Sequence, residues 1–267
     1  MKISHESPLS LLNESLKFND YQYILPTFYN KYSKYKEFML NYRKQKDSFI
    51  ILDNGLFEGD NLTTAELLVL IYEIKPDIFI VPDEWNDTTK TLVNAKSWIL
   101  NYKSKLPKNT NLMAVLQGKS YGELVVCYQT LVDLGYKHMS FNHSSEAYFD
   151  IFPNKPKLIA QSEGRKHLID NLIKDKILNS KLYHHLLGAS TWYEFGLYSE
   201  NNIYNFIKSC DTSAPIINGA LEVIFDDHEY EKPKQKLEEF MEMEFDENQL
   251  RCINYNLSVF REICQDF

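Results

Sequence analysis

Short apolar runs alternate with amphipathic segments along nearly the whole chain. The runs lie at residues 21–27, 49–53, 78–82, 112–117, 138–142 and 183–188, with a last pair around Asp211 and residues 221–225. Runs that are apolar on both faces and separated by helical segments predict a parallel sheet covered by helices. About eight such units favour a single (β/α)₈ TIM barrel over an open doubly wound α/β sheet. No glycine-rich phosphate loop follows the first run, which also argues against a dinucleotide-binding fold.

Two of the helical segments begin with a recognisable capping box. Thr63 is followed by Glu66, and Ser120 by Glu123. In this motif the hydroxyl accepts from one backbone N–H and the glutamate returns to another. The last helix is expected over residues 248–264, where it would close the barrel. No repeat, low-complexity tract or linker divides the sequence, so we expect one domain spanning residues 1–267.

The composition is that of a soluble globular protein, with 44% hydrophobic and 25% charged residues. No basic segment followed by an apolar stretch opens the sequence, and the longest apolar run is too short to cross a bilayer. We therefore expect a cytoplasmic protein, in the host cytoplasm if it is viral. The four cysteines form no C-x-x-C pair, which predicts free thiols and no zinc or other cofactor.

The net charge of −8 argues against a nucleic-acid partner, because phosphate binding needs a basic surface. The distribution of charge weakens that objection. Basic residues gather at residues 31–46 and 155–181, whereas acidic residues gather at residues 222–247. Lys34 in the first basic stretch, and Arg165 and Lys166 at an expected helix start in the second, are candidates for phosphate contacts. A solvated surface is the alternative for each.

Polar side chains directly end five of the apolar runs. They are Asp53, Asp83, Gln117, Asn142 and Asp211. In a (β/α)₈ barrel the active site lies at the C-terminal ends of the strands, so these five side chains are expected to converge on one pocket. A helix cap or turn is the alternative for any single one. Carboxylates with amides and no His/Cys cluster favour metal-free chemistry at a sugar carbon, and magnesium on the same carboxylates stays an alternative.

Other residues near the run ends have a possible binding role. Gly55, Gly118 and Gly188 would let the backbone approach a flat ligand closely. His184 and His185 lie on one expected strand and point to opposite faces, so one of them would face the pocket unless it is packed or hydrogen-bonded. Base stacking, with simple packing as the alternative, is considered for Phe57, Trp85, Phe141 and Trp192.

These segments resemble the tRNA-guanine transglycosylase superfamily in the same order along the chain. The family's Asp-Ser-Gly-Gly-Phe signature is similar to residues 53–57, its base-recognising Asp to Asp83, and its Gln-Gly pair to Gln117-Gly118. Its Met-Gly strand end resembles Leu187-Gly188, and its nucleophilic Asp with a Pro four residues later resembles Asp211 and Pro215. Asn218-Gly219 and residues 254–257 look like its closing strand and last helix.

Three features depart from the family pattern. The zinc-binding Cys/His cluster is absent, and residues 222–247 occupy its place. Ile216 and Ile217 replace basic residues after the nucleophile, and Asn142-His143 replaces a Gly-Gly pair. The sequence looks closest to the short, zinc-free relatives of bacteriophages, which are associated with placing 7-deazaguanine bases into DNA.

The resemblance implies a base-exchange reaction. Asp211 would attack the anomeric carbon of a guanosine or deoxyguanosine and expel guanine, leaving a covalent glycosyl-enzyme. A free 7-deazaguanine base, in its 7-cyano form, would then enter, and Asp53 would take its ring proton. Asp83, Gln117, Gly118, Asn142 and Gly188 would hold the base. The alternatives are the same exchange on tRNA, hydrolysis of an N-glycosidic bond by Asp53 and Asp211, and a barrel that only binds nucleic acid.

Overall fold

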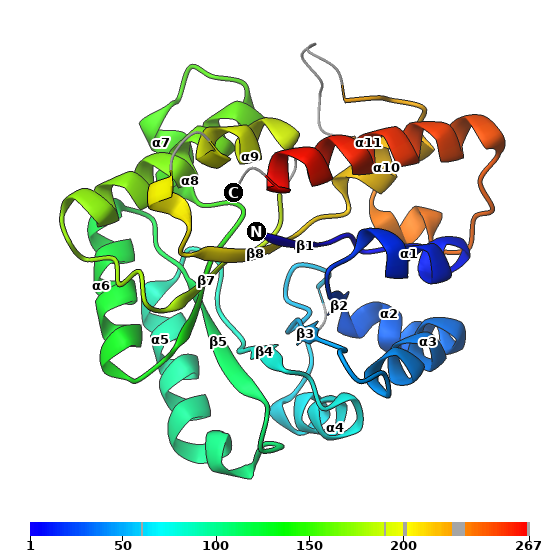
Figure 1. The fold of residues 1–267 in the computed structure, drawn as a ribbon. Helices are drawn as coiled ribbons and strands as arrows, with labels where there is room; N and C mark the ends of the chain where they lie inside the picture. The colour runs from blue at the N-terminus through cyan, green and yellow to red at the C-terminus, as the bar shows by residue number, and fades with distance from the viewer. Residues whose placement is uncertain (60, 190, 200–201, 226–232, 266–267) are drawn as a thin grey trace.

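The computed structural model describes residues 1–59, 61–189, 191–199, 202–225 and 233–265, and these form a (β/α)₈ barrel (Figure 1). Every strand pairing in the sheet is parallel, and the order is β1-β8-β7-β6-β5-β4-β3-β2. The strands are β1 (Lys2–Ser4), β2 (Gln22–Ile24), β3 (Ile50–Leu52), β4 (Ile78–Ile80), β5 (Asn111–Leu116), β6 (His138–Phe141), β7 (Tyr183–Leu186) and β8 (Ile207–Asp211). The predicted fold class is therefore confirmed.

Helices connect the strands and form the outer layer of the barrel (Figure 1). They are α1 (Leu12–Phe18), α2 (Pro26–Lys31), α3 (Ser33–Arg43), α4 (Thr64–Ile74), α5 (Thr88–Ser97), α6 (Tyr121–Asp133), α7 (Glu146–Ile151), α8 (Lys157–Lys174), α9 (Trp192–Ser199), α10 (Ala214–Ala220) and α11 (Glu247–Gln265). Short 3₁₀ turns include η5 (Leu237–Phe240), and α5 runs on into a π-helical turn, η2 (Trp98–Tyr102). α11 packs against α10 and α9, at the position expected for the last helix.

The barrel closes between its first and second strands through side chains as well as backbone. The Asp20 N–H donates to the Ile3 carbonyl (2.9 Å), and the Ile3 N–H donates to Asp20 Oδ2 (2.9 Å). One step further along, the Tyr23 N–H donates to Ser4 Oγ (3.1 Å). On the other side of β1, Ser4 is level with Asp211 of β8. β1 thus pairs with β8 on one side and contacts the chain at the start of β2 on the other.

The predicted eighth strand is wrong. Residues 221–225 follow the end of α10 as a turn, in which Glu222 has a positive φ of 61°, and a segment without regular secondary structure. Asn218 and Gly219, expected in the closing strand, lie inside α10. The first strand is instead β1, whose three residues are too short to show a periodic pattern. The strands predicted around residues 21–27 to 183–188 and at Asp211 are all present.

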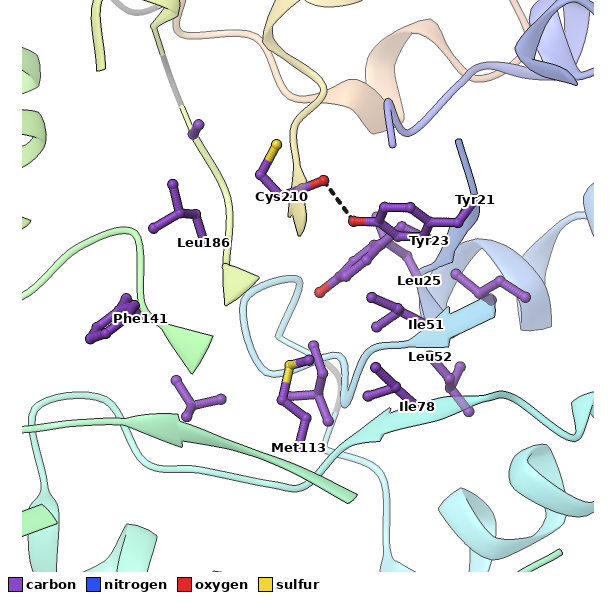
Figure 2. Close-up of a cluster of buried hydrophobic side chains, with 14 of the residues drawn as sticks. Tyr21, Tyr23, Leu25, Ile51, Leu52, Ile78, Met113, Phe141, Leu186 and Cys210 are labelled. Atoms are coloured by element: carbon purple, nitrogen blue, oxygen red, sulfur yellow. Dashed lines mark hydrogen bonds between the residues drawn. The ribbon is translucent and has the colours of Figure 1, made fainter. Parts of the chain in front are cut away.

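Large side chains fill the barrel interior, as Figure 2 shows. Ile51 of β3 and Met113 of β5 are fully buried there. The Tyr21 hydroxyl reaches from the start of β2 and donates to the Cys210 carbonyl on β8 (2.6 Å; Figure 2). This bond links the start of β2 directly to β8, past the short strand β1. A side chain in the interior therefore also helps to close the barrel.

Of the two predicted capping boxes, one is complete. At the start of α4 the Glu66 N–H donates to Thr63 Oγ1, and the Thr63 N–H donates back to Glu66 Oε2 (2.8 Å). At the start of α6 the Glu123 N–H donates to Ser120, but the Glu123 carboxylate accepts from Lys119 instead. All four cysteines are free, as predicted, and they are buried. Among the described helices, none is both long and apolar enough to cross a membrane.

Candidate active site

A cavity of about 430 Å³ opens at the C-terminal ends of the strands, and all five polar strand-end residues line it. They are Asp53, Asp83, Gln117, Asn142 and Asp211. Each is at least nine-tenths buried, although it follows or ends a strand. The cavity volume lies in the range typical of small-molecule sites. The predicted convergence on one pocket is therefore observed, while the chemical role of each residue stays a prediction.

Asp211, the last residue of β8, is held by two donors on one oxygen. Its Oδ1 accepts from the Gly188 N–H (3.0 Å) and lies 2.8 Å from His185 Nε2. His185 Nδ1 lies 2.8 Å from Ser209 Oγ, which also accepts from the Tyr183 hydroxyl (2.7 Å). With a proton on His185 Nε2 and with Nδ1 accepting from the Ser209 hydroxyl, every group in this chain has a partner. These contacts fix the orientation of the Asp211 carboxylate.

Nothing in the sequence indicated that His185 reaches this carboxylate, because a histidine on a strand is more often packed. Its neighbour His184 follows that common pattern. His184 points to the other face of the sheet, where Nε2 lies 3.0 Å from the Tyr128 hydroxyl and Nδ1 lies 3.1 Å from the Leu182 carbonyl. Burial lowers the pKa of His184 to about 4, so it is neutral at physiological pH. The expected opposite orientation of the two rings is confirmed.

Glu6 also lines the cavity and is a residue that the sequence reasoning missed. It lies two residues beyond β1, and its side chain is hydrogen-bonded to that of Asp211. Burial raises the pKa of Glu6 well above its ordinary value, and the charge of Asp211 and the hydrogen bond to it raise that pKa further. Glu6 could have been recognised as a strand-end residue only if β1, the strand before it, had been predicted.

Asp53, directly after β3, lies in the same cavity in a different environment. Burial raises its pKa to about 7, against the opposing effect of the Asn54 backbone hydrogen bond. The charge of Asp211 raises this pKa further, and a hydrogen bond from Tyr23 lowers it. A carboxyl with a pKa near neutrality takes up or releases a proton readily at physiological pH, as a general acid or base must.

Four side chains beyond Asp53 form a continuous hydrogen-bonded edge of the cavity. Asp83 accepts from Asn54 Nδ2 on Oδ1 (2.8 Å) and from Gln117 Nε2 on Oδ2 (2.6 Å). Gln117 Oε1 in turn accepts from Asn142 Nδ2 (3.0 Å). Burial raises the pKa of Asp83, while the bonds from Gln117 and Asn54 oppose this shift. The edge therefore presents a fixed alternation of carboxylate and amide groups, which suits a ligand with both donors and acceptors.

Gly188 and Gly118, both predicted to contact a base, differ in position. Gly188 lines the cavity with a φ of +67°, which favours glycine, and its N–H reaches Asp211. Gly118 is not among the residues that line the cavity. A Cβ at Gly118 would lie 3.0 Å from Glu123 Cβ and 3.1 Å from Thr88 Oγ1, so this glycine permits close packing of α6. The prediction that Gly118 contacts the base is therefore corrected.

Arg165 does not contact phosphate, contrary to the prediction. It lies in the middle of α8, not at a helix start, and it is fully buried. Its guanidinium forms an ion pair with Glu194 (2.6 Å) and donates to the carbonyl of Gly188 (2.8 Å). It also donates to the carbonyls of Phe141 and Leu187 at the ends of β6 and β7. Arg165 thus connects the chain after β6 and β7 next to the cavity. Its position in a basic stretch did not indicate this structural role.

The other two predicted phosphate contacts are lysines on the outer helices. Lys34 is exposed near the start of α3, on the side of the barrel where the strands end. Lys166 lies halfway along α8 in an ion pair with Asp170 (2.8 Å). Neither lysine lines the cavity. Their contact with nucleic acid stays a prediction, for which Lys34 has the more accessible position.

Of the four aromatic residues considered for stacking, two line the cavity. Phe57 and Trp85 are 66% and 52% exposed, which leaves their ring faces accessible at its rim. Phe141 is buried against His184, and Trp192 begins α9 away from the cavity lining. Packing therefore explains Phe141, while Phe57 and Trp85 remain candidates for stacking on a base.

No protein-family model matches this chain, and no curated protein matches it. Within the described ranges, no three or more His, Cys, Asp or Glu side chains are grouped so that they could hold a metal ion. Support for a particular reaction therefore comes from the cavity itself, together with the motif resemblance of its lining residues.

Proposed function

We propose that this chain is a base-exchange glycosyltransferase that replaces guanine in a polynucleotide with a 7-deazaguanine base. The observation that supports this most is the pairing of Asp53 and Asp211 in one cavity beside the Asp83–Gln117–Asn142 edge. Nucleophilic substitution at a sugar carbon uses one carboxylate that attacks and a second group that handles the proton. The hydrogen-bonded edge adds the polar groups that a purine base needs for recognition.

In the first half-reaction, an Asp211 oxygen attacks C1′ of the target nucleotide. The bond between C1′ and guanine N9 breaks, its electron pair goes to the base, and protonated Asp53 supplies the proton to the departing guanine. The product is a glycosyl ester on Asp211 and a neutral guanine. The Gly188 N–H and His185 hold Asp211 through Oδ1 and so orient it for attack.

In the second half-reaction, the incoming 7-deazaguanine gives its N9 proton to Asp53 and forms the new bond to C1′. The ester bond breaks, and Asp211 leaves as a carboxylate. Because the pKa of Asp53 is about 7, the same group can give a proton in one step and take it in the next. The Asp83–Gln117–Asn142 edge would bind either base in turn, since guanine and 7-deazaguanine share their pyrimidine-ring donors and acceptors.

The polymer is proposed to be DNA, in line with the resemblance to the zinc-free relatives. A guanine in a duplex must be flipped out or met in a single strand to enter a cavity of this kind. Phe57 and Trp85 lie exposed at the cavity rim, where they would stack on bases next to the flipped one.

The test is incubation of the purified protein with labelled guanine and either DNA or tRNA. Label that enters a guanine-containing polymer supports base exchange, and label in DNA supports the proposed polymer. Release of free guanine with no incorporation would favour the hydrolase. Binding to nucleic acid with neither release nor incorporation would favour the barrel that only binds. Incorporation of 7-cyano-7-deazaguanine in competition with guanine then tests the identity of the incoming base.

A further inference from the structure

Glu6 is a buried carboxyl in the cavity, and the proposed base exchange by Asp53 and Asp211 assigns it no role. It follows β1, whose residue Ser4 is level with Asp211 on the neighbouring strand β8. This register brings the chain directly after β1 alongside the end of β8. Glu6 is only 7% exposed, lines the cavity and is hydrogen-bonded to Asp211.

Among the described residues, the ionisable groups that influence Glu6 most are acidic. The carboxylates that face it are Asp211 and Glu58, and the tyrosine hydroxyls influenced by its charge are Tyr21, Tyr23 and Tyr35. Glu6 forms no ion pair with a lysine or arginine within the described ranges. Its buried Oε1 receives no hydrogen bond from any described donor. Two carboxyl groups form a hydrogen bond only when they share a proton, so one of this pair is protonated.

We assign the shared proton to Glu6 by comparing the hydrogen bonds that the two carboxyl groups accept. Asp211 Oδ1 already accepts from a backbone N–H and from His185, so this oxygen serves as an acceptor. Glu6 has an unsatisfied buried oxygen, and its burial disfavours its charged form. The O–H of Glu6 therefore donates to Asp211, which becomes a carboxylate held by three donors.

We propose that Glu6 is a positioning residue that acts in its protonated form, as a fixed hydrogen-bond donor to the attacking carboxylate. This inference rests on the proposed function of Asp211 as nucleophile. In this role Glu6 keeps its proton throughout the reaction. Loss of that proton would place a second negative charge beside Asp211 and turn a donor into a repelling group, so that the attacking geometry is lost.

The test compares Glu6→Gln with Glu6→Ala across a pH series of base exchange. The carboxamide of the glutamine variant has nearly the shape of the protonated acid, donates an N–H, and has no proton to lose. We expect Glu6→Gln to retain activity within about tenfold. Its activity should fall less steeply at alkaline pH than that of wild type, because only the loss of the Asp53 proton then lowers activity. Glu6→Ala should lose on the order of 100-fold, since misplacing a reacting group by about 1 Å has that effect. Glu58→Gln, the matched control at the other facing carboxyl, should keep the alkaline fall.

A second measurement does not depend on activity. Infrared difference spectra of wild type minus Glu6→Gln should contain the carbonyl band of a protonated carboxylic acid at neutral pH. The absence of that band would overturn the proposal, as would a Glu6→Gln protein that folds but loses exchange at every pH, because Glu6 would then transfer its proton. A protein that shows the band but exchanges no base would refute the proposed function while leaving the protonated Glu6–Asp211 pair established.

Discussion

Asp53 and Asp211 lie in one cavity but differ in what surrounds their oxygens. Asp211 receives a backbone N–H and the His185 ring on Oδ1, so its orientation is fixed. Asp53 accepts from the Gly55 N–H at 3.3 Å, and burial dominates its environment. Fixed orientation suits a nucleophile, and a pKa near 7 suits proton transfer. The two environments thus separate two roles for the same residue type.

Asp211→Ala should abolish base exchange and leave the fold intact. The carboxylate is a strand-end group in a cavity and contributes little to packing, whereas its loss removes the covalent route. We expect a decrease on the order of 10⁶-fold, as for removal of a catalytic serine nucleophile. Incorporation of labelled guanine measures the activity, and circular dichroism and thermal unfolding serve as the folding control. Normal turnover by a folded Asp211→Ala protein would refute the mechanism.

Asp53→Asn should stabilise the protein at neutral and alkaline pH. The folded pKa of about 7 exceeds the ordinary 3.8, so between about pH 4 and pH 7 the folded state keeps a proton that the unfolded state has lost. Stability therefore falls as pH rises through this window, by up to about 4 kcal/mol, and asparagine removes this loss. Denaturant midpoints across a pH series measure the effect.

The matched control for Asp53→Asn is Asp87→Asn. At the start of α5, the Lys90 backbone N–H lowers the pKa of Asp87, so its contribution to stability is lost as pH falls. Its difference from wild type should therefore change with pH in the opposite direction to that of Asp53→Asn. A stability difference for Asp53→Asn that stays constant from acid to alkaline pH would contradict the assigned pKa.

The sequence predicted the polar strand-end residues because parallel strands in a barrel all end at one face. It predicted neither Glu6 nor His185. Glu6 follows a strand of three residues, too short for a periodic pattern, so nothing marked it as a strand-end residue. For His185, the alternation of side chains allowed a position in the pocket, but only the register of β7 against β8 shows that it meets Asp211. Residues whose role depends on a neighbouring strand cannot be recognised from one strand alone.

At the scale of elements, the sequence predicted seven of the eight strands and misplaced the remaining one. Residues 221–225 are apolar enough for a strand, but α10 is held against α11 by a glycine contact and the chain turns where it ends. Arg165 illustrates the same limit for helices. A basic residue in a charged stretch is expected to be exposed, yet this one lies on the inner face of α8 and pairs with Glu194 of α9. Tertiary packing decides both cases.

Gly219→Ala should destabilise the protein, because α10 and α11 touch at this residue. A Cβ there would lie 2.5 Å from the backbone N and Cα of Ile253, so the helices must separate. We expect a loss of about 1–3 kcal/mol. Gly196→Ala in α9 is the control, since nothing lies within 4 Å of its added Cβ, and alanine in a helix should be neutral or stabilising by about 0.5–1 kcal/mol. Equal unfolding midpoints for the two variants would contradict this account of the α10–α11 contact.

At the scale of the whole molecule, the proposed function requires an acidic cavity to receive part of a polyanion. The protein carries a net charge of −8, and the carboxyl groups that line the cavity are those of Glu6, Asp53, Glu58, Asp83, Asp211 and Glu238. The raised pKa values of Glu6 and Asp53 reduce the negative charge that a nucleic acid would meet there. Lys234 and Lys236 add positive charge to the lining. Further positive charge lies outside the cavity, where Lys34 and Lys157 are exposed near the starts of α3 and α8.

The two basic stretches differ in how much of their charge is available to a partner. Lys31, Lys36 and Arg43 form ion pairs with Glu238, Glu73 and Asp77, and Lys166 pairs with Asp170. Lys34 and Lys157 have no ion pair among the described residues. Each is near the beginning of a helix, α3 or α8, that leads to the start of the next strand, so both lie on the cavity side of the barrel. Within the basic stretches, we therefore expect these two lysines to carry most of the phosphate contact.

DNA that contains deoxyguanosine should be the preferred polymer, and its affinity should fall steeply as salt rises. Phosphate contacts release counterions, so each lost contact lowers the salt slope by about one. Lys34→Glu and Lys157→Glu should weaken DNA binding without changing exchange at saturating DNA, and Lys166→Glu should weaken it less because Lys166 is paired. Lys108→Glu, in the loop before β5 on the opposite face, is the matched control and should bind as wild type does. The measurement is a competition between DNA and tRNA of equal guanine content at low salt. Label found in tRNA and never in DNA would show that the polymer is wrong, while leaving the barrel and the role of Asp211 intact.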